Sequence, residues 1–112
     1  MIANTIRAQR DVKLMRIARR IIKKFRPEQI ILFGSHARGQ AGPSSDVDLL
    51  VVMPVVGSTR EKSIEIQLAL SDLRIPIDII VTRPEDFSWR KDVIGTIEWP
   101  AAHEGRVLYA RT

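Results

Sequence analysis

Apolar residues are arranged along this chain in two ways, at helical spacing in some segments and in short continuous runs in others. Residues 11–25 carry an apolar side chain every three or four positions, which is the pattern of a helix with one buried face. Short apolar runs are typical of strands that are buried on both faces of a sheet. The predicted order is helix 11–25, strand 28–33, short helix 35–39, strand 49–52, helix 58–73, strand 76–81, a short helix from Pro84, helix 93–103 and strand 107–109. This order predicts an α/β (α+β) fold, in which a small mixed sheet of about four strands packs against helices.

Local signals mark several of these boundaries. Asp11 is the expected N-cap of the first helix. Ser58, with Glu61 three positions later, forms a capping box at the start of the long central helix. Pro100 interrupts the last predicted helix and indicates a kink or two joined pieces. Residues 1–10 precede the expected N-cap and are assigned to a disordered N-terminal arm.

The stretch 34–48 contains the residues most suggestive of chemistry. Gly34 and Ser35 directly follow the first strand, and ten residues separate Ser35 from Asp46. Asp46 and Asp48 begin the second strand, where residues two apart point to the same face, so both carboxylates are expected close together. Such a pair needs a compensating cation, and oxygen-only ligands of this kind suit Mg²⁺. Gly34 lets the backbone approach a ligand, and Ser35 opens a short helix that can receive a phosphate.

A third aspartate, Asp78, lies inside the apolar run of the third strand. A charge in such a run is costly unless it is paired, bound to a metal or placed at an exposed end. A salt bridge to Arg74 is the structural alternative. If the third strand lies beside the second, three carboxylates converge and can hold two metal ions. The candidate catalytic and metal-binding residues are therefore Asp46, Asp48 and Asp78.

Three further side chains of the 34–48 stretch are candidates with open alternatives. Arg38 either contacts a triphosphate through its guanidinium or pairs with a nearby acid. Ser45 either donates to a phosphate or caps the loop. His36 is better explained as a solvent-facing residue than as a base. The candidate nucleotide-binding residues are Gly34, Ser35, Arg38 and Ser45.

Gly34-Ser35, ten residues and then Asp46-x-Asp48 resembles the signature of the nucleotidyltransferases of the DNA polymerase β superfamily. The fuller string Gly-Ser-x-Ala-Arg-Gly … Ser-Asp-x-Asp-Leu is similar to the minimal nucleotidyltransferases of bacteria and archaea, and the likeness extends from about residue 12 to residue 109. That family carries a third acidic residue on a later strand, for which Asp78 is the candidate. The resemblance implies the nucleotidyltransferase fold, with ATP or another nucleoside triphosphate as substrate and Mg²⁺, two ions, as cofactor.

The resemblance also implies a partner. Many minimal nucleotidyltransferases are encoded beside HEPN-domain proteins and act with them as toxin–antitoxin pairs. This chain is therefore expected to be an antitoxin that transfers AMP to a tyrosine of a HEPN toxin (AMPylation). Two alternatives are an antitoxin that acts by binding alone and a subunit of an RNA-end nucleotidyltransferase.

Positive charge is concentrated at the start of the chain. The net charge is +5, yet residues 1–26 hold nine Lys or Arg and one acid, whereas the other 86 residues hold nine basic and twelve acidic side chains. Such a basic helix attracts RNA, an acidic partner or the phosphates of the nucleotide, or is simply the solvated face of a packed helix. Because no aromatic residues are interleaved with the cations, the solvated face is the simpler interpretation.

Length and composition limit the class of protein. A chain of 112 residues, 45% of them hydrophobic, fits a single domain over residues 1–112. The absence of cysteine excludes a disulfide framework and a thiolate metal site. There is no signal-peptide core and no apolar run near the ~20 residues that cross a bilayer, so we expect a cytoplasmic protein without a membrane partner.

Overall fold

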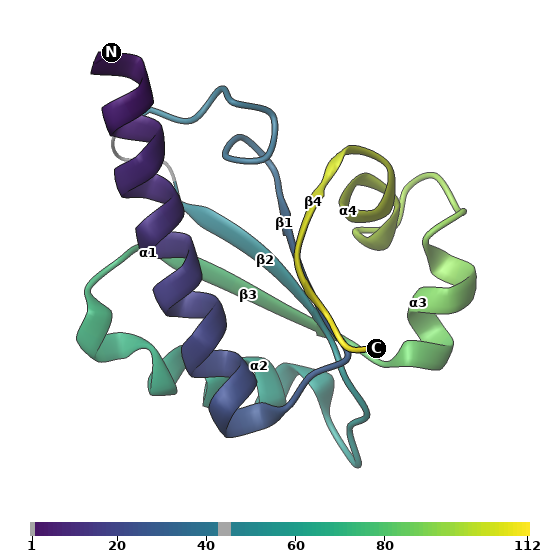
Figure 1. The fold of residues 1–112 in the computed structure, drawn as a ribbon. Helices are drawn as coiled ribbons and strands as arrows, with labels where there is room; N and C mark the ends of the chain where they lie inside the picture. The colour runs from purple at the N-terminus through teal and green to yellow at the C-terminus, as the bar shows by residue number, and fades with distance from the viewer. Residues whose placement is uncertain (1, 43–45) are drawn as a thin grey trace.

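The computed structural model describes residues 2–42 and 46–112, with side chains from Asp11 onward. Over these residues the elements are α1 (Ile2–Phe25), β1 (Gln29–Phe33), β2 (Val47–Val52), α2 (Thr59–Ala69), the 3₁₀ turn η1 (Ser71–Leu73), β3 (Ile77–Thr82), α3 (Pro84–Arg90), α4 (Glu98–Glu104) and β4 (Arg106–Ala110). The four described strands form one mixed sheet in the order β3-β2-β1-β4 (Figure 1). β1 is antiparallel to β2 and β4, and β2 is parallel to β3. The predicted fold class is confirmed.

Helices cover both faces of this sheet (Figure 1). On one face, Leu49 of β2 packs in a cluster with Ile17 of α1 and Ile66 of α2. On the other face, Leu50 belongs to a cluster with Phe87 of α3. Successive residues of β2 therefore face different helical layers, which explains why the strand reads as a continuous apolar run.

The first helix is longer than predicted. It begins at Ile2 rather than after Asp11, so the N-cap assigned to Asp11 is wrong. Residues 2–10 contain no proline or glycine and include several good helix formers, so nothing in them stops the helix. The helix ends where Arg26 takes a positive φ of 50°. Among the described helices, α1 included, none is long and apolar enough to span a membrane.

The second helix begins as predicted and ends early. Ser58 is its N-cap, and the Ser58 hydroxyl accepts a hydrogen bond from the Glu61 N–H at 3.1 Å. The predicted helix 58–73 is divided into α2 and η1. Near this division the Ser71 hydroxyl donates to the Leu68 carbonyl at 2.8 Å, a local bond that competes with regular helix geometry.

The last helix is shorter than predicted. Residues 91–97 form turns, and α4 starts only at Glu98. Pro100 is then the third residue of α4. Backbone N–H groups in the first turn have no partner within the helix, so the missing N–H of Pro100 costs no hydrogen bond and the helix is not kinked. Glu98 is buried and ties α4 to β3, because it accepts hydrogen bonds from the Thr82 hydroxyl at 2.9 Å and from Arg90 Nε at 3.0 Å.

Candidate active site

The three predicted aspartates lie at the beginnings of two neighbouring strands. Asp46 immediately precedes β2, while Asp48 and Asp78 are the second residues of β2 and β3. Asp48 is the register partner of Asp78 in this parallel pair. Because register partners project to the same face of a sheet, the structure brings Asp48 and Asp78 together, and alternation adds Asp46. This is the face that Leu50 and Ile80 present to the layer of α3 and α4.

The electrostatics of Asp48 reflect this grouping. Partial burial raises the pKa of the Asp48 carboxyl above its usual 3.8, and the charges of Asp78 and then Asp46 raise it further. The nearby charges of His36 and Arg38 lower it in part. The site therefore holds an excess of negative charge that a cation would relieve.

Among residues 2–42 and 46–112, no basic side chain forms an ion pair with these aspartates. The alternative in which Asp78 is explained by a salt bridge to Arg74 is therefore not observed. Asp46 and Asp78 are exposed, and Asp48 is partly buried. The carboxylates are open to an incoming ligand.

Gly34 makes room for the Asp48 carboxylate. Phe33, the last residue of β1, is the register partner of Asp48, and Gly34 follows with a φ of +75°. A Cβ added at Gly34 would collide with Asp48 Oδ2 and lie 3.3 Å from its Cγ. Only glycine fits both this backbone conformation and this close approach. The predicted bend and the predicted carboxylate are thus direct neighbours.

The loop after Gly34 is a series of turns, so the predicted helix 35–39 is wrong. The Gln40 N–H reaches back to the Ser35 carbonyl at 2.9 Å, and the Arg38 N–H to the Gly34 carbonyl at 3.2 Å, without the repeated bonds of a helix. The glycines at both ends of this segment, each with positive φ, favour turns over helix here. Any phosphate contact at Ser35 would therefore use turn N–H groups and the hydroxyl rather than a helix terminus.

The other candidates in this stretch are placed as follows. Arg38 is exposed and donates from Nε to Gln40 Oε1 at 3.3 Å, and no described carboxylate forms an ion pair with it. Its charge nevertheless acts on Asp48, as does that of His36. Ser45 lies outside the described residues.

Gln67 of α2 is a site residue that the sequence reasoning did not identify. Asp78 lies on β3, which is the edge strand of the sheet. The Gln67 side-chain amide donates to the Ile77 carbonyl oxygen and accepts from the Ile79 N–H at 3.3 Å. The Gln67 amide therefore bonds the outward-facing backbone groups on both sides of Asp78, as the backbone of a further strand would. No sequence signal for this existed, because Gln67 resembles an ordinary exposed helix residue.

The donor set fits a divalent ion that keeps other ligands. In the described part of the chain, no three His, Cys, Asp or Glu side chains are already arranged as a metal cage. The donor atoms are nevertheless all carboxylate oxygens, from Asp46, Asp48 and Asp78. The negative charges of Asp78 and Asp46 repel that of Asp48 and raise its pKa. Mg²⁺ characteristically takes one or two carboxylates and completes its shell with water and substrate phosphates.

The fold and the grouping of the three aspartates are those expected of a nucleotidyltransferase domain. The sequence pattern of the nucleotidyltransferase domain matches residues 14–99, more than half of the chain. The chain therefore belongs to the nucleotidyltransferase domain family, and both the resemblance seen in the sequence and the predicted transferase class are confirmed.

Several solved structures share this fold at low sequence identity. A "putative nucleotidyltransferase from Sulfolobus solfataricus" superimposes with a TM-score of 0.64 and 20% identity, over 98% of this chain and 86% of that chain. A toxin–antitoxin structure with AMP-PNP gives a TM-score of 0.59 at 21% identity, over 91% of this chain and 74% of that chain. A toxin–antitoxin MntA–HpeT mutant gives 0.58 at 19% identity over the same shares, and it carries two Asp-to-Glu replacements two positions apart.

A curated relative is closer in sequence over a shorter segment. The "Putative protein adenylyltransferase MJ0141" of Methanocaldococcus jannaschii is 36% identical over 61 residues, which are 54% of this chain and 61% of that protein. The matched segment thus spans about three-fifths of the length of that relative.

Proposed function

We propose that this chain transfers a nucleoside monophosphate, AMP from ATP being the expected case, to a hydroxyl group of a protein partner. The observation that carries the proposal is the grouping of Asp46, Asp48 and Asp78 on one face of the sheet, beside the bend at Gly34. Membership of the nucleotidyltransferase domain family supports the reaction class.

The residues divide the chemistry among them. Gly34, Ser35 and Arg38 bind the triphosphate through backbone N–H groups, a hydroxyl and a guanidinium. Asp46, Asp48 and Asp78 would hold Mg²⁺, two ions in the proposed complex, which would neutralise charge at the phosphate oxygens and make the acceptor hydroxyl more acidic.

The proposed reaction is one displacement at the α-phosphorus. The acceptor oxygen forms a bond to this phosphorus, while the bond to the bridging oxygen of the β-phosphate breaks. Pyrophosphate leaves with the electron pair of that bond. Asp78 accepts the proton of the acceptor hydroxyl, because it is exposed and lies on the edge strand of the sheet, where another molecule has access to it.

A protein acceptor is supported by the names of the relatives. The curated relative is described as a protein adenylyltransferase, and two solved neighbours are toxin–antitoxin assemblies, one of them with AMP-PNP. The paired replacements in the MntA–HpeT mutant have the same spacing as Asp46 and Asp48. We therefore propose an antitoxin that adenylylates its toxin, with a tyrosine of a HEPN-domain protein as the acceptor suggested by the family resemblance.

The test is incubation of the chain with ATP, Mg²⁺ and the protein encoded beside it, followed by mass measurement of both proteins. We expect the neighbour to gain the mass of one or more AMP groups, and Asp78→Asn to abolish the gain. Asp92→Asn, a change of an exposed aspartate near α4, is the matched control and should leave the gain intact.

Toxin inhibition separates this proposal from an antitoxin that acts by binding alone. If Asp46→Asn with Asp48→Asn still binds and silences the toxin as well as the unchanged protein does, catalysis is not the means of neutralisation. Loss of inhibition with retained binding supports transfer.

A further inference from the structure

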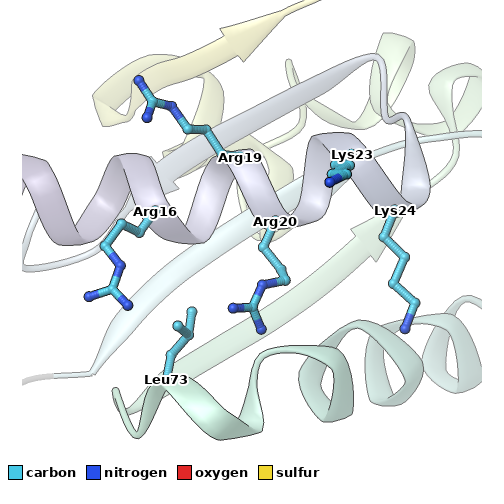
Figure 2. Close-up of a pocket in the computed structure, with 6 residues that line it drawn as sticks. All are labelled: Arg16, Arg19, Arg20, Lys23, Lys24 and Leu73. Atoms are coloured by element: carbon cyan, nitrogen blue, oxygen red, sulfur yellow. The ribbon is translucent and has the colours of Figure 1, made fainter.

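Five cations of α1 line one hollow on the surface (Figure 2). The hollow has a volume of about 600 Å³ and is lined by Arg16, Arg19, Arg20, Lys23, Lys24 and Leu73. Arg16, Arg20 and Lys24 recur at intervals of four, so they share one side of the helix. They extend in the same direction, toward Leu73 and the α2 layer (Figure 2). We call this surface the α1 groove.

The positive charge of the α1 groove is only slightly compensated. Arg20 pairs with Asp72 at 2.6 Å and also donates to the Ala69 carbonyl at 3.2 Å. Within the part of the chain that the structure describes, no carboxylate pairs with the other four cations. Like charges around a concave surface repel one another and concentrate the electrostatic field there, which attracts anions.

The α1 groove is separate from the site of the three aspartates. α1 packs on the face of the sheet that carries Leu49 and Ile79, whereas Asp48 and Asp78 project from the opposite face. The sheet thus separates α1 from the layer of α3 and α4 (Figure 1). The groove therefore cannot serve the triphosphate that the aspartates would bind, and its charge requires another explanation.

The arrangement of the cations suits a linear polyanion. Arg16, Arg20 and Lys24 follow one another at intervals of four residues, or ~6 Å along the helix. Arg19 extends to the other side of α1 and is not part of this row (Figure 2). Guanidinium forks match phosphate oxygens in pairs. The lining contains no aromatic side chain on which a base could stack.

We propose that the α1 groove binds the sugar–phosphate backbone of single-stranded RNA without reading its bases. Regularly spaced charges favour a repeating phosphate chain over the irregular carboxylates of an acidic protein. A strand bound here lies on the side of the sheet away from the aspartates, so RNA is a binding partner and not the acceptor of the nucleotide. This inference is independent of the proposed transfer reaction.

The experiment measures fluorescence anisotropy of a labelled oligouridylate with the full chain, between about 50 and 300 mM NaCl. Four unpaired cations predict that log K falls with log salt with a slope of about −3. An oligoadenylate of the same length should bind within about twofold, because the groove has no base-stacking platform.

Charge variants locate the binding. Arg16→Ala with Lys23→Ala should weaken binding of both oligonucleotides and reduce the slope to about half. Lys91→Ala with Arg83→Ala removes the same net charge at the two ends of α3, on the other face of the sheet, and should have little effect. Asp72→Asn should strengthen binding and steepen the slope by about 0.7, because it releases Arg20 from its ion pair.

Several results would overturn the inference. If both double variants lose binding equally, only the overall charge attracts RNA. If polyglutamate competes as well as RNA, the groove recognises carboxylates and its partner is an acidic protein. Absence of RNA binding near 50 mM salt, or weaker binding by Asp72→Asn, also contradicts it. Circular dichroism verifies that each variant is folded, and retained transfer activity in Arg16→Ala with Lys23→Ala keeps this test separate from the proposed function.

Discussion

The absence of a side chain at Gly34 leaves room for the Asp48 carboxylate, and this close contact joins the bend after β1 to the start of β2. The Asp48 carboxylate occupies the space that a side chain at position 34 would need. Gly39, in the same loop, has a similar φ of +70° but no atom near the position of its missing Cβ. A comparison of alanine variants at Gly34 and Gly39 therefore distinguishes the cost of backbone strain from the cost of a steric clash.

Gly39→Ala is expected to lower the free energy of unfolding by about 1 kcal/mol, the cost of a left-handed conformation for alanine. Gly34→Ala is expected to lower it by about 2–3 kcal/mol and to reduce transfer activity at least about tenfold, because the carboxylate must also move. Urea denaturation and the transfer assay measure the two effects. Equal losses in both variants would show that the contact with Asp48 has no separate role.

Asp48→Asn is expected to abolish transfer and yet to stabilise the metal-free protein. The folded state raises the pKa of Asp48 above 3.8, so its ionised form destabilises the fold at neutral pH, and this penalty disappears as the pH falls through the raised pKa. Removing the charge should raise Tm in EDTA at pH 7.

Asp72→Asn is the matched control for this prediction and should have the opposite sign. The hydrogen bond from Arg20 lowers the pKa of Asp72, so its ionised form is stabilising above pH 3.8 and this contribution is lost as the pH falls through the lowered pKa. A lower Tm for Asp48→Asn, measured beside Asp72→Asn, would contradict the electrostatic interpretation.

At the scale of elements, the edge strand β3 depends on α2 for its order around Asp78. A strand at a sheet edge leaves alternate backbone groups without a neighbour. Gln67 satisfies the Ile77 carbonyl and the Ile79 N–H together. Helix α2 thus acts on the site through the backbone of β3.

Gln67→Ala is expected to lower the free energy of unfolding by about 1 kcal/mol, because water replaces both bonds at this accessible edge. It should reduce kcat for transfer about tenfold and leave the KM for ATP nearly unchanged, since Asp78 loses its support while the loop at Gly34 and Ser35, proposed to bind the phosphates, is untouched. Glu65→Ala, at an exposed position of the same helix, is the control. A change in stability with unaltered kcat would assign Gln67 a purely structural role.

The prediction of secondary structure is correct where the sequence signal is local. Strand β2 is recognisable because both of its faces are buried, and Ser58 marks the start of α2 because its hydroxyl satisfies the Glu61 N–H. The interruption predicted at Pro100 is wrong, because Pro100 lies in the first turn of α4, where a proline is tolerated and does not bend the helix.

The parts of the site that could not be predicted depend on contacts between distant segments. The register that sets Asp48 opposite Asp78 joins strands separated by α2 and η1. The bracing by Gln67 requires α2 to lie along the edge of β3, which no local pattern specifies. The clash between a side chain at Gly34 and Asp48 likewise exists only in the folded chain. The residue types were readable from the sequence, whereas their mutual support was not.

At the scale of the whole molecule, the described side chains form two apolar clusters that hold the fold, and neither cluster includes the three aspartates. Metal binding is therefore expected to complete the site rather than to build the protein. This distinguishes the chain from small domains that unfold when their structural metal is removed.

Removal of divalent ions with EDTA should leave the circular dichroism spectrum unchanged and abolish transfer. Mg²⁺ with a non-hydrolysable ATP analogue, at about ten times the dissociation constant, should add about 1.4 kcal/mol of stability and raise Tm by about 5 °C or more. The variant with Asn at positions 46, 48 and 78 should show no such rise. Unfolding in EDTA alone would contradict the separation of core and site.

Because the sheet separates the two helical layers, a ligand can bind on one side of the molecule without covering the other side (Figure 1). A protein retained through α1 on an immobilised polyanion, such as a heparin resin, would keep its aspartates turned toward the bulk solution. When its acceptor protein is supplied in solution, the resin-bound chain should accordingly still transfer AMP from ATP, which would make the matrix both a purification step and a solid support for catalysis.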